Sequence, residues 1–342
     1  MSEIERNFQL QHFLKFLENR FNTTPSLLET RWLRVAGLVV RLECRNPTLL
    51  KYLDIQLACC FANDGEEPDA VFRLWHGDIA ACLDSFCTEK KVHIVEDNVQ
   101  TLIVDQDKGR LYAFDKDHNT SYLCLNDCSD ESVANQGYLL YQLLYNLAKR
   151  KGRLMLHGAA LGYDNKGVLI CGGSGHGKST LAVSSFLQNC QYVSDDHLVL
   201  TRDGNTTRAW PVYSIASLYE SSLIRMPELK LSSRWLKEGL KHVFDVSAYH
   251  QQFCFGLPLK ALIYPILIPE EKKPSFTTIP AGRVLTNLIW STITQMNDRR
   301  DSEHIRNMLH FLKHLPCYQL TLSSDIESNA KLLKNFVLNQ IK

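Results

Sequence analysis

One glycine-rich stretch combines residue types that could bind phosphate groups. Residues 172–179 read GGSGHGKS, which matches the pattern G-x-x-x-x-G-K-[ST] at every fixed position. An apolar run at 168–171 precedes the stretch as an expected buried strand, and a helical pattern begins at Leu181. A strand, a glycine loop and a helix in this order are the context that the phosphate-binding motif requires. The alternative is a glycine-rich turn that binds nothing.

Each part of this loop has a chemical task in binding ATP with Mg²⁺. Its glycines let the backbone take positive φ and approach a ligand closely, so the loop N–H groups can turn toward phosphate oxygens. The N-terminus of the next helix adds partial positive charge. Lys178 supplies a full charge to the outer phosphates, and Ser179 supplies a hydroxyl for Mg²⁺. The predicted nucleotide contacts are Gly172, Gly173, Ser174, Gly175, His176, Gly177, Lys178, Ser179 and Thr180. We expect His176 to contribute only its backbone N–H.

Three further residues are expected on strands beside this loop. His157 follows an apolar run upstream of the loop, and Asp195 and Asp196 end a strand downstream of its helix. Successive side chains of a strand point to opposite faces. One carboxylate can therefore face Mg²⁺ while the other faces the group that accepts a phosphate. The alternatives are a buried structural histidine at His157 and a turn or helix cap at the two aspartates.

The composition is that of a globular protein without the marks of nucleic-acid or membrane binding. The 342 residues are 45% hydrophobic and 22% charged, and the formal net charge is +1. The sequence has no basic stripe, and no apolar run reaches the roughly 18 residues of a membrane helix. The acidic, polar N-terminus lacks the features of a signal peptide. We therefore expect reduced cysteines, a cytoplasmic location, and neither nucleic acid nor membrane as a partner.

The pattern of elements divides the chain into two predicted domains near residue 150. Residues 7–21 have the apolar spacing of an amphipathic helix, and short strand-like runs with polar turns fill 70–125. We expect an antiparallel meander there, within an α+β domain at 1–150. This domain either recognises a substrate or only braces the rest of the chain. We favour recognition because it carries no catalytic cluster.

The second predicted domain, 151–342, is an α/β unit that contains the glycine loop and a mixed sheet. A helix over 131–149 leads the chain into it. Outside the loop region, strands are expected over 154–156, 259–268 and 318–322, and helices over 232–244, 281–295, 302–315 and 326–341.

The motifs together resemble the HPr kinase/phosphorylase family. The shared features are a Leu-His-Gly run, a G-x-S-G-x-G-K-S loop and a strand that ends in Asp-Asp, and the resemblance covers 154–200 well and extends loosely to about 320. It implies an α/β P-loop kinase core of the type that this family shares with phosphoenolpyruvate carboxykinase, plus an N-terminal α+β domain. The order of elements also looks like that of HPr-kinase-like proteins from bacterial biosynthetic gene clusters.

The resemblance implies a role for each site residue. Asp195 would take the proton from an acceptor hydroxyl, and His157 would pair with Asp195 and hold it in place. Asp196 would join Ser179 on Mg²⁺, and Lys178 would neutralise the β- and γ-phosphates of ATP. Four arginines are candidates for a transition-state cation, and the resemblance does not choose among them: Arg225, Arg283, Arg299 and Arg300.

These observations predict an ATP-dependent kinase that phosphorylates a hydroxyl of a peptide, a protein serine or a small metabolite. Two departures from the family argue against HPr as the acceptor. Thr180 stands where the family usually has Glu, and the glycine-rich signature that binds HPr has no match after Asp196. A second class stays open: a nucleotide-binding regulator or assembly factor that hydrolyses ATP slowly and has no phosphoryl acceptor. The sequence also leaves open whether the protein forms a homo-oligomer.

Overall fold

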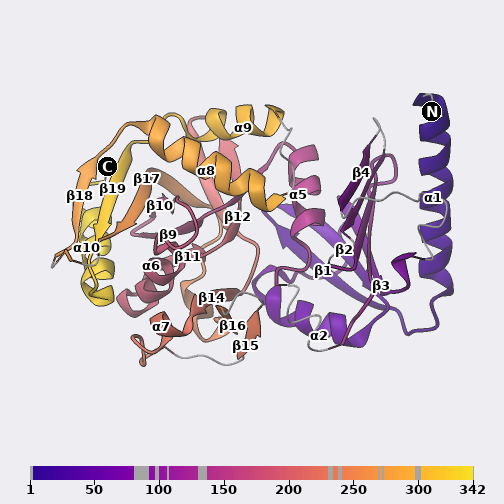
Figure 1. Ribbon diagram of the computed structural model, residues 1–342, viewed down its shortest axis with the longest axis horizontal. Coiled ribbons are helices and arrows are strands. Elements are labelled where there is room, and N and C mark those ends of the chain that lie inside the picture. The colour runs from indigo at the N-terminus through magenta and orange to yellow at the C-terminus, as the bar shows by residue number, and fades with distance from the viewer. Residues whose placement is uncertain are drawn as a thin grey trace. The chain divides into compact units, whose positions relative to one another are not determined.

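The computed structural model describes residues 3–80, 92–96, 100–105, 108–129, 137–229, 234–237, 241–268, 270–271, 273–296 and 302–341. The chain separates into two compact units (Figure 1). The first unit consists of Met1–Ile55 and Phe61–Leu143, and the second of Gln56–Cys60 and Leu144–Lys342. Their boundary lies inside helix α5 (Tyr141–Arg150), whereas the sequence pattern predicted it near residue 150, at the end of a helix over 131–149. The described helix is shorter than predicted, since 137–140 are not helical and 131–136 lie outside the described residues.

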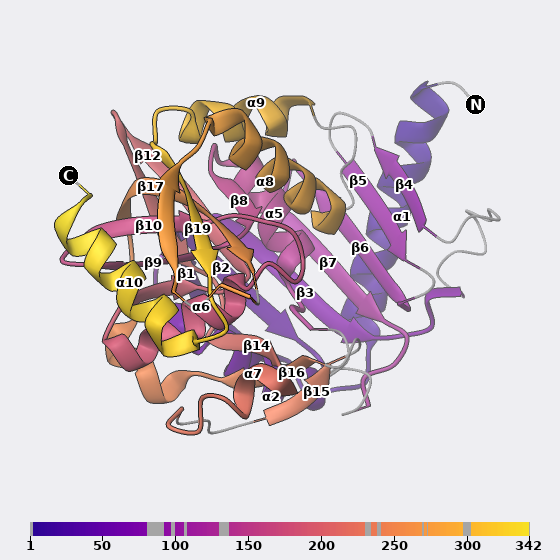
Figure 2. The same cartoon turned by 60° about the vertical axis from the view of Figure 1, so that its left-hand side comes forward.

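A seven-stranded sheet is the framework of the first unit, with the strand order β1-β2-β3-β7-β6-β5-β4 (Figure 2). Its strands are β1 (Glu29–Val35), β2 (Leu38–Cys44), β3 (Ala70–His76), β4 (Val92–Glu96), β5 (Gln100–Asp105), β6 (Arg110–Asp115) and β7 (Thr120–Leu125). Strands β4 to β7 form an antiparallel meander, as predicted. Strand β3 departs from the prediction because it pairs in parallel with both β2 and β7.

The first unit contains helix α1 (Glu3–Thr23) and most of helix α2 (Pro47–Gln56). Helix α1 packs on the sheet through the apolar stripe that predicted it. The buried side chains of this stripe share one core with residues of β3, β5, β6 and β7, and they are Leu10, Phe13, Leu14, Leu17 and Phe21. The amphipathic pattern therefore predicted both the helix and the side chains through which it packs on the sheet.

The second unit is built on a nine-stranded mixed sheet. Its main path runs β11-β9-β10-β17-β13-β12-β8, and β19 pairs with β17 and β18. The strands are β8 (Leu154–His157), β9 (Ala159–Tyr163), β10 (Lys166–Ile170), β11 (Gln191–Ser194), β12 (His197–Asp203), β13 (Thr206–Pro211), β17 (Leu257–Leu267), β18 (Ser275–Thr278) and β19 (Cys317–Leu322). Strand β17 is parallel to β10 and β19, while its contact with β13 is antiparallel. The predicted α/β class with a mixed sheet is confirmed.

Helices cover both faces of this sheet (Figures 1 and 2). The helices of the unit, besides α5, are α6 (Lys178–Ser184), α7 (Glu220–Leu223), α8 (Ala281–Met296), α9 (Ser302–Leu312) and α10 (Ile326–Asn339). Helices α6 and α10 share a core with Val168 and Ile170 of β10, whereas α8 and α9 share a second core with Leu169. This division follows from the alternation of side chains along a strand. The glycine loop after β10 therefore starts from a strand that is buried on both faces.

The stretch 232–244 was predicted as a helix, and this prediction is wrong. It contains β15 (Arg234–Lys237) and β16 (Lys241–Asp245), which pair antiparallel. Strand β14 (Ile215–Tyr219) pairs with the other edge of β16 and completes a three-stranded sheet in the order β14-β16-β15. Aromatic and β-branched residues favour strands, and pairing with β14 overrides the local helical pattern here.

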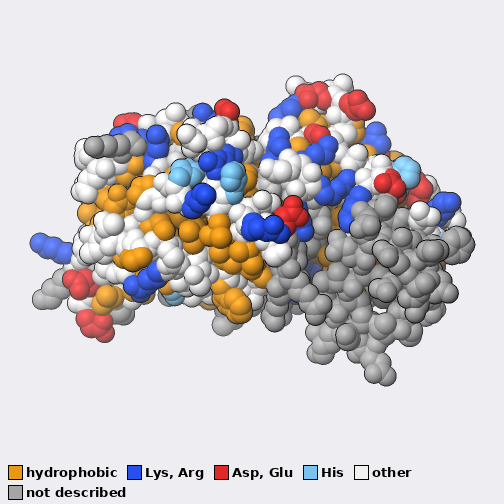
Figure 3. All heavy atoms as spheres, turned by 90° about the horizontal axis from the view of Figure 1, so that it is seen from above, with side chains coloured by type: hydrophobic (Ala, Val, Ile, Leu, Met, Phe, Trp, Pro, Cys, Tyr) orange, Lys and Arg blue, Asp and Glu red, His pale blue; other side chains and the backbone are white. Residues whose placement is uncertain are grey.

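Hydrophobic and basic side chains share the surface on the side of α8 and α9 (Figure 3). Trp290 of α8 is 69% exposed. Among the residues that the structure describes, no helix is long and apolar enough to cross a membrane. The described cysteines form no disulfide.

Candidate active site

The glycine loop joins β10 to α6, so the predicted order of strand, loop and helix is confirmed. The loop backbone takes positive φ at three glycines: Gly172 (150°), Gly175 (82°) and Gly177 (86°). Gly177 also lies against β19, since a Cβ at this position would be 2.7 Å from the side chain of Leu322. Both the left-handed conformation and the close approach require glycine at residue 177.

Lys178 turns back into the loop that precedes it. Its Nζ donates a hydrogen bond of 3.0 Å to the carbonyl oxygen of Gly173, and the residue is only 6% exposed. Burial lowers the pKa of Lys178, and the negative charge of Asp196 opposes this effect. An anion in the loop would offer this buried cation a partner of opposite charge.

Asp195 lies almost completely buried beside the first turn of α6. Its Oδ1 accepts a hydrogen bond from the Tyr192 hydroxyl (3.3 Å), and its Oδ2 accepts one from the backbone N–H of Ser217 (3.2 Å). The Ser179 hydroxyl donates to the backbone oxygen of Asp195 at 3.4 Å. Burial, together with the negative charge of Asp196, raises the pKa of Asp195 to about 7. A carboxylate that is 1% exposed and next to a loop hydroxyl is poised to accept a cation.

His157 pairs with Asp196, so the expected pair of His157 with Asp195 is wrong. The Nε2 of His157 lies 2.8 Å from Oδ1 of Asp196, and the other carboxylate oxygen is 3.8 Å from Nδ1 of His197. The pairing of β8 with β12 explains why His157 contacts Asp196 and not Asp195. His157 of β8 faces His197 of β12 in register, and the Gly158 N–H donates to the backbone oxygen of Asp196 at 2.7 Å.

The two aspartates therefore occupy different environments, as their alternation on the chain predicts. The carboxylate of Asp195 accepts hydrogen bonds from Tyr192 and Ser217, whereas the carboxylate of Asp196 faces the two histidines. The side chain of Asp196 is 14% exposed, so a substrate can reach it more easily than the buried Asp195. The sequence could not tell which aspartate takes which side, because that depends on strand register.

The ring of His176 braces the loop from within, which the sequence did not predict. A Cβ on Gly172 would lie 3.2 Å from Nδ1 of His176, and the imidazole makes an edge contact with the ring of Tyr264 at 5.6 Å between centroids. Burial lowers the pKa of His176, and the charge of Lys178 adds to this effect. The guanidinium of Arg283 lies 5.5 Å from the centroid of the same Tyr264 ring.

Several residues around the site carry no recognisable motif and were missed. Tyr192 and Ser217 hold the carboxylate of Asp195, and Thr292 of α8 accepts a hydrogen bond of 3.2 Å from the backbone N–H of His157. Ser217 and Thr292 come from distant parts of the chain, so only the fold brings them to the site. Of the four candidate arginines, Arg225 is exposed, Arg283 stacks on Tyr264, and the other two lie outside the described residues.

The oxygen atoms at the start of α6 are of the kind that Mg²⁺ takes in nucleotide sites. Within the described ranges, no group of three or more His, Cys, Asp or Glu side chains could hold a metal ion. Mg²⁺ in nucleotide sites usually takes one or two protein oxygens and completes its shell with phosphate oxygens and water. The Ser179 hydroxyl, which donates to the backbone oxygen of Asp195, and the carboxylate of the same Asp195 are oxygen groups of this kind.

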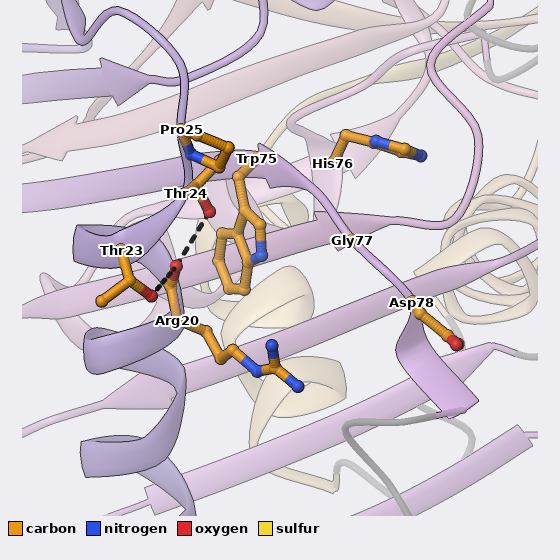
Figure 4. A pocket seen from close by; sticks show the side chains of 8 residues that line it. All are labelled: Arg20, Thr23, Thr24, Pro25, Trp75, His76, Gly77 and Asp78. Atoms are coloured by element: carbon orange, nitrogen blue, oxygen red, sulfur yellow. Dashed lines mark hydrogen bonds between the residues drawn. The ribbon is translucent and has the colours of Figure 1, made fainter.

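A separate pocket of about 230 Å³ lies in the first unit and contains none of these residues. Its lining comes from the end of α1 and from the end of β3: Arg20, Thr23, Thr24, Pro25, Trp75, His76, Gly77 and Asp78. In Figure 4 the indole of Trp75 stands between the end of α1 and the strand, with the Arg20 side chain below it. The hydroxyls of Thr23 and Thr24 donate to the Arg20 carbonyl oxygen. Substrate recognition by this unit stays a prediction.

Comparison with known proteins shows a distant structural similarity. No protein-family model and no curated protein matches the chain. Among solved structures, the chain is similar to the Hpr(Ser) kinase/phosphatase from Coxiella burnetii, with 18% sequence identity and a TM-score of 0.29. The match covers 54% of this chain and 94% of that protein. A similarity of this size fixes no activity.

Proposed function

We propose that the protein is an ATP-dependent phosphotransferase, which moves the γ-phosphoryl group of ATP to a hydroxyl acceptor. One observation carries the proposal. A G-x-x-x-x-G-K-S loop lies beside two adjacent aspartates: the backbone oxygen of Asp195 accepts a hydrogen bond from Ser179 of the loop, and the carboxylate of Asp196 is paired with His157. Phosphoryl transfer needs cations for the phosphates and a nearby carboxylate for the attacking hydroxyl.

The loop provides the nucleotide site in this proposal. Residues 172–180 surround the β- and γ-phosphates with backbone N–H groups, and Lys178 supplies a positive charge from inside the loop. Ser179 and Asp195 would hold Mg²⁺, which neutralises charge on the phosphate oxygens when it is bound. Filling this site would also relieve the cost of the buried Asp195 carboxylate.

Asp196 serves as the general base in this proposal. The acceptor oxygen forms a bond to the γ-phosphorus while the bond between this phosphorus and the β–γ bridging oxygen breaks. ADP leaves, and the hydroxyl proton passes to Asp196. His157 orients the carboxylate through its 2.8 Å contact. This assignment exchanges the roles that the family resemblance implied for Asp195 and Asp196, because His157 and the greater exposure both belong to Asp196.

The acceptor class follows from the base. A single carboxylate with a histidine behind it suits an alcohol, since the proton leaves only as the oxygen attacks phosphorus. A peptide serine, a protein serine or a small hydroxylated metabolite has this chemistry. The competing function is a nucleotide-binding regulator, in which water takes the place of the acceptor.

Transfer from γ-³²P-labelled ATP tests the proposal. The purified protein is incubated with Mg²⁺ and, separately, with serine, sugars and a library of serine-containing peptides. We expect label on at least one acceptor class and about 10²–10⁴-fold less transfer in Asp196→Asn. Slow release of labelled phosphate that no acceptor stimulates would favour the regulator instead. An absence of both ATP binding and turnover would overturn both functions.

A further inference from the structure

We propose that Lys241 is a second cation of the phosphate site and contacts the phosphoryl group during transfer. The proposal rests on the phosphotransferase function argued above. It names the transition-state cation that the sequence left undecided among four arginines. Lys241 opens strand β16 of the three-stranded sheet and belongs to the same unit as the glycine loop.

Two hydrogen bonds fix strand β14 and the residues that follow it against the site. Within β14, the Ser217 N–H donates to the carboxylate of Asp195 at 3.2 Å. Beyond the strand, the Ser222 hydroxyl lies 3.0 Å from the hydroxyl of Thr180, the last residue of the predicted loop contacts. Tyr219 lies between these two anchored residues. This end of β14 is therefore held beside Asp195 and Thr180.

Lys241 lies directly opposite Tyr219 in the antiparallel pairing of β14 with β16. Residues that face each other across such a pair project to the same side of the sheet. Accordingly, Nζ of Lys241 lies 5.2 Å from the centroid of the Tyr219 ring. Lys241 is half-buried and forms no ion pair with any described residue, so its charge is available to a ligand.

The positive charge of Lys241 acts on two residues of the site, Lys178 and Asp195. Burial is the main cause of the lowered pKa of Lys178, and the positive charge of Lys241 lowers it further. Lys241 also acts on Asp195, where its charge opposes the rise in pKa that burial causes. Lys241 is therefore close enough to both Lys178 and the Asp195 carboxylate for its charge to act on each of them.

Lys241 and Lys178 approach the proposed phosphate site from different directions. Lys178 approaches the phosphates from inside the loop and is tied to the Gly173 carbonyl. Lys241 approaches from another sheet and has no ion-pair partner among the residues that the structure describes. Charge on the transferring group spreads over its equatorial oxygens, and a fixed cation aimed there acts most strongly in the transition state. We therefore expect Lys241 to affect catalysis more than nucleotide affinity.

The experiment compares ADP with ADP plus aluminium fluoride, a mimic of the phosphoryl group in transit, by calorimetry in the presence of Mg²⁺. It needs no knowledge of the acceptor. In the wild-type protein we expect the fluoride complex to bind more tightly than ADP alone. Lys241→Met should lose about 10²-fold of this gain while its affinity for ADP stays within a few-fold. Lys241→Arg should keep most of the gain.

Lys260→Met, which removes an exposed lysine from β17, is the matched control and should behave as wild type. If Lys241→Met retained the full gain, Lys241 would not be the cation, while the proposed function would stand. If Lys241→Met failed to fold, Lys241→Gln would provide the same comparison. A wild-type protein that bound neither ADP nor ATP would refute the proposed function itself and this inference with it.

Discussion

The two adjacent aspartates make separable contributions, and replacing each by asparagine should reveal which one is the base. Asp196→Asn keeps the shape of the side chain and removes the proton acceptor, while the contact with His157 is a hydrogen bond that an amide oxygen can still accept. General bases contribute about 10²–10⁴-fold, which corresponds to roughly 3–5 kcal/mol of transition-state stabilisation. We therefore expect phosphoryl transfer to fall by this factor, with ATP affinity changed by no more than a few-fold.

Asp195→Asn should behave differently because Asp195 is buried next to Ser179. Loss of this carboxylate removes the proposed ligand of Mg²⁺ and should weaken ATP binding in the presence of Mg²⁺ together with transfer. Binding without Mg²⁺ should change little. Calorimetry with and without EDTA, combined with single-turnover transfer, separates these effects. If Asp195→Asn lost transfer while its Mg²⁺-dependent ATP affinity stayed normal, Asp195 would be the base and our assignment would be refuted.

The remaining predictions concern His157, the loop and a helix cap. Because His157 is proposed only to orient the base, His157→Ala should reduce transfer less than Asp196→Asn does. Kinetic assays at saturating ATP measure this difference. Gly177→Ala should lower the free energy of unfolding in urea by at least about 1 kcal/mol, because the φ of residue 177 is 86° and the new Cβ would lie 2.7 Å from Leu322. Unchanged stability would contradict this loop geometry. Asp325→Ala removes the N-cap of α10 and should cost about 1 kcal/mol at pH 7. Hydrogen bonds from Ser328 and Glu327 lower the pKa of Asp325, so its contribution is present above about pH 4 and is lost as the pH falls through the lowered value. Thermal melts across this range should show the difference from wild type shrinking toward acid pH, and a difference that grew would be inconsistent with the cap.

Some of the fold and site could be read from the sequence because the signals are local. The loop motif, its flanking strand and helix, and the amphipathic α1 all depend on residues within a few positions of one another. The alternation of side chains also gave the separation of Asp195 from Asp196.

Features that depend on pairing between distant strands could not be predicted. The partner of His157 is set by the register of β8 with β12, and the hairpin of β15 and β16 forms against β14. Lys241 carries no motif, and only this sheet brings it to Tyr219 beside the loop. Local sequence patterns show where these residues stand in the chain, but they do not predict which distant strands pair and so which of these residues meet.

ATP binding to the wild-type protein and to Lys178→Ala, measured by calorimetry with Mg²⁺, tests the central claim most directly. Charge-assisted hydrogen bonds contribute about 1.5–3 kcal/mol, so the variant should bind ATP roughly 10–150-fold more weakly. Lys260→Ala removes the same charge at an exposed position and should bind ATP as the wild type does. Equal ATP affinity in wild type and Lys178→Ala would show that this loop does not hold the nucleotide phosphates.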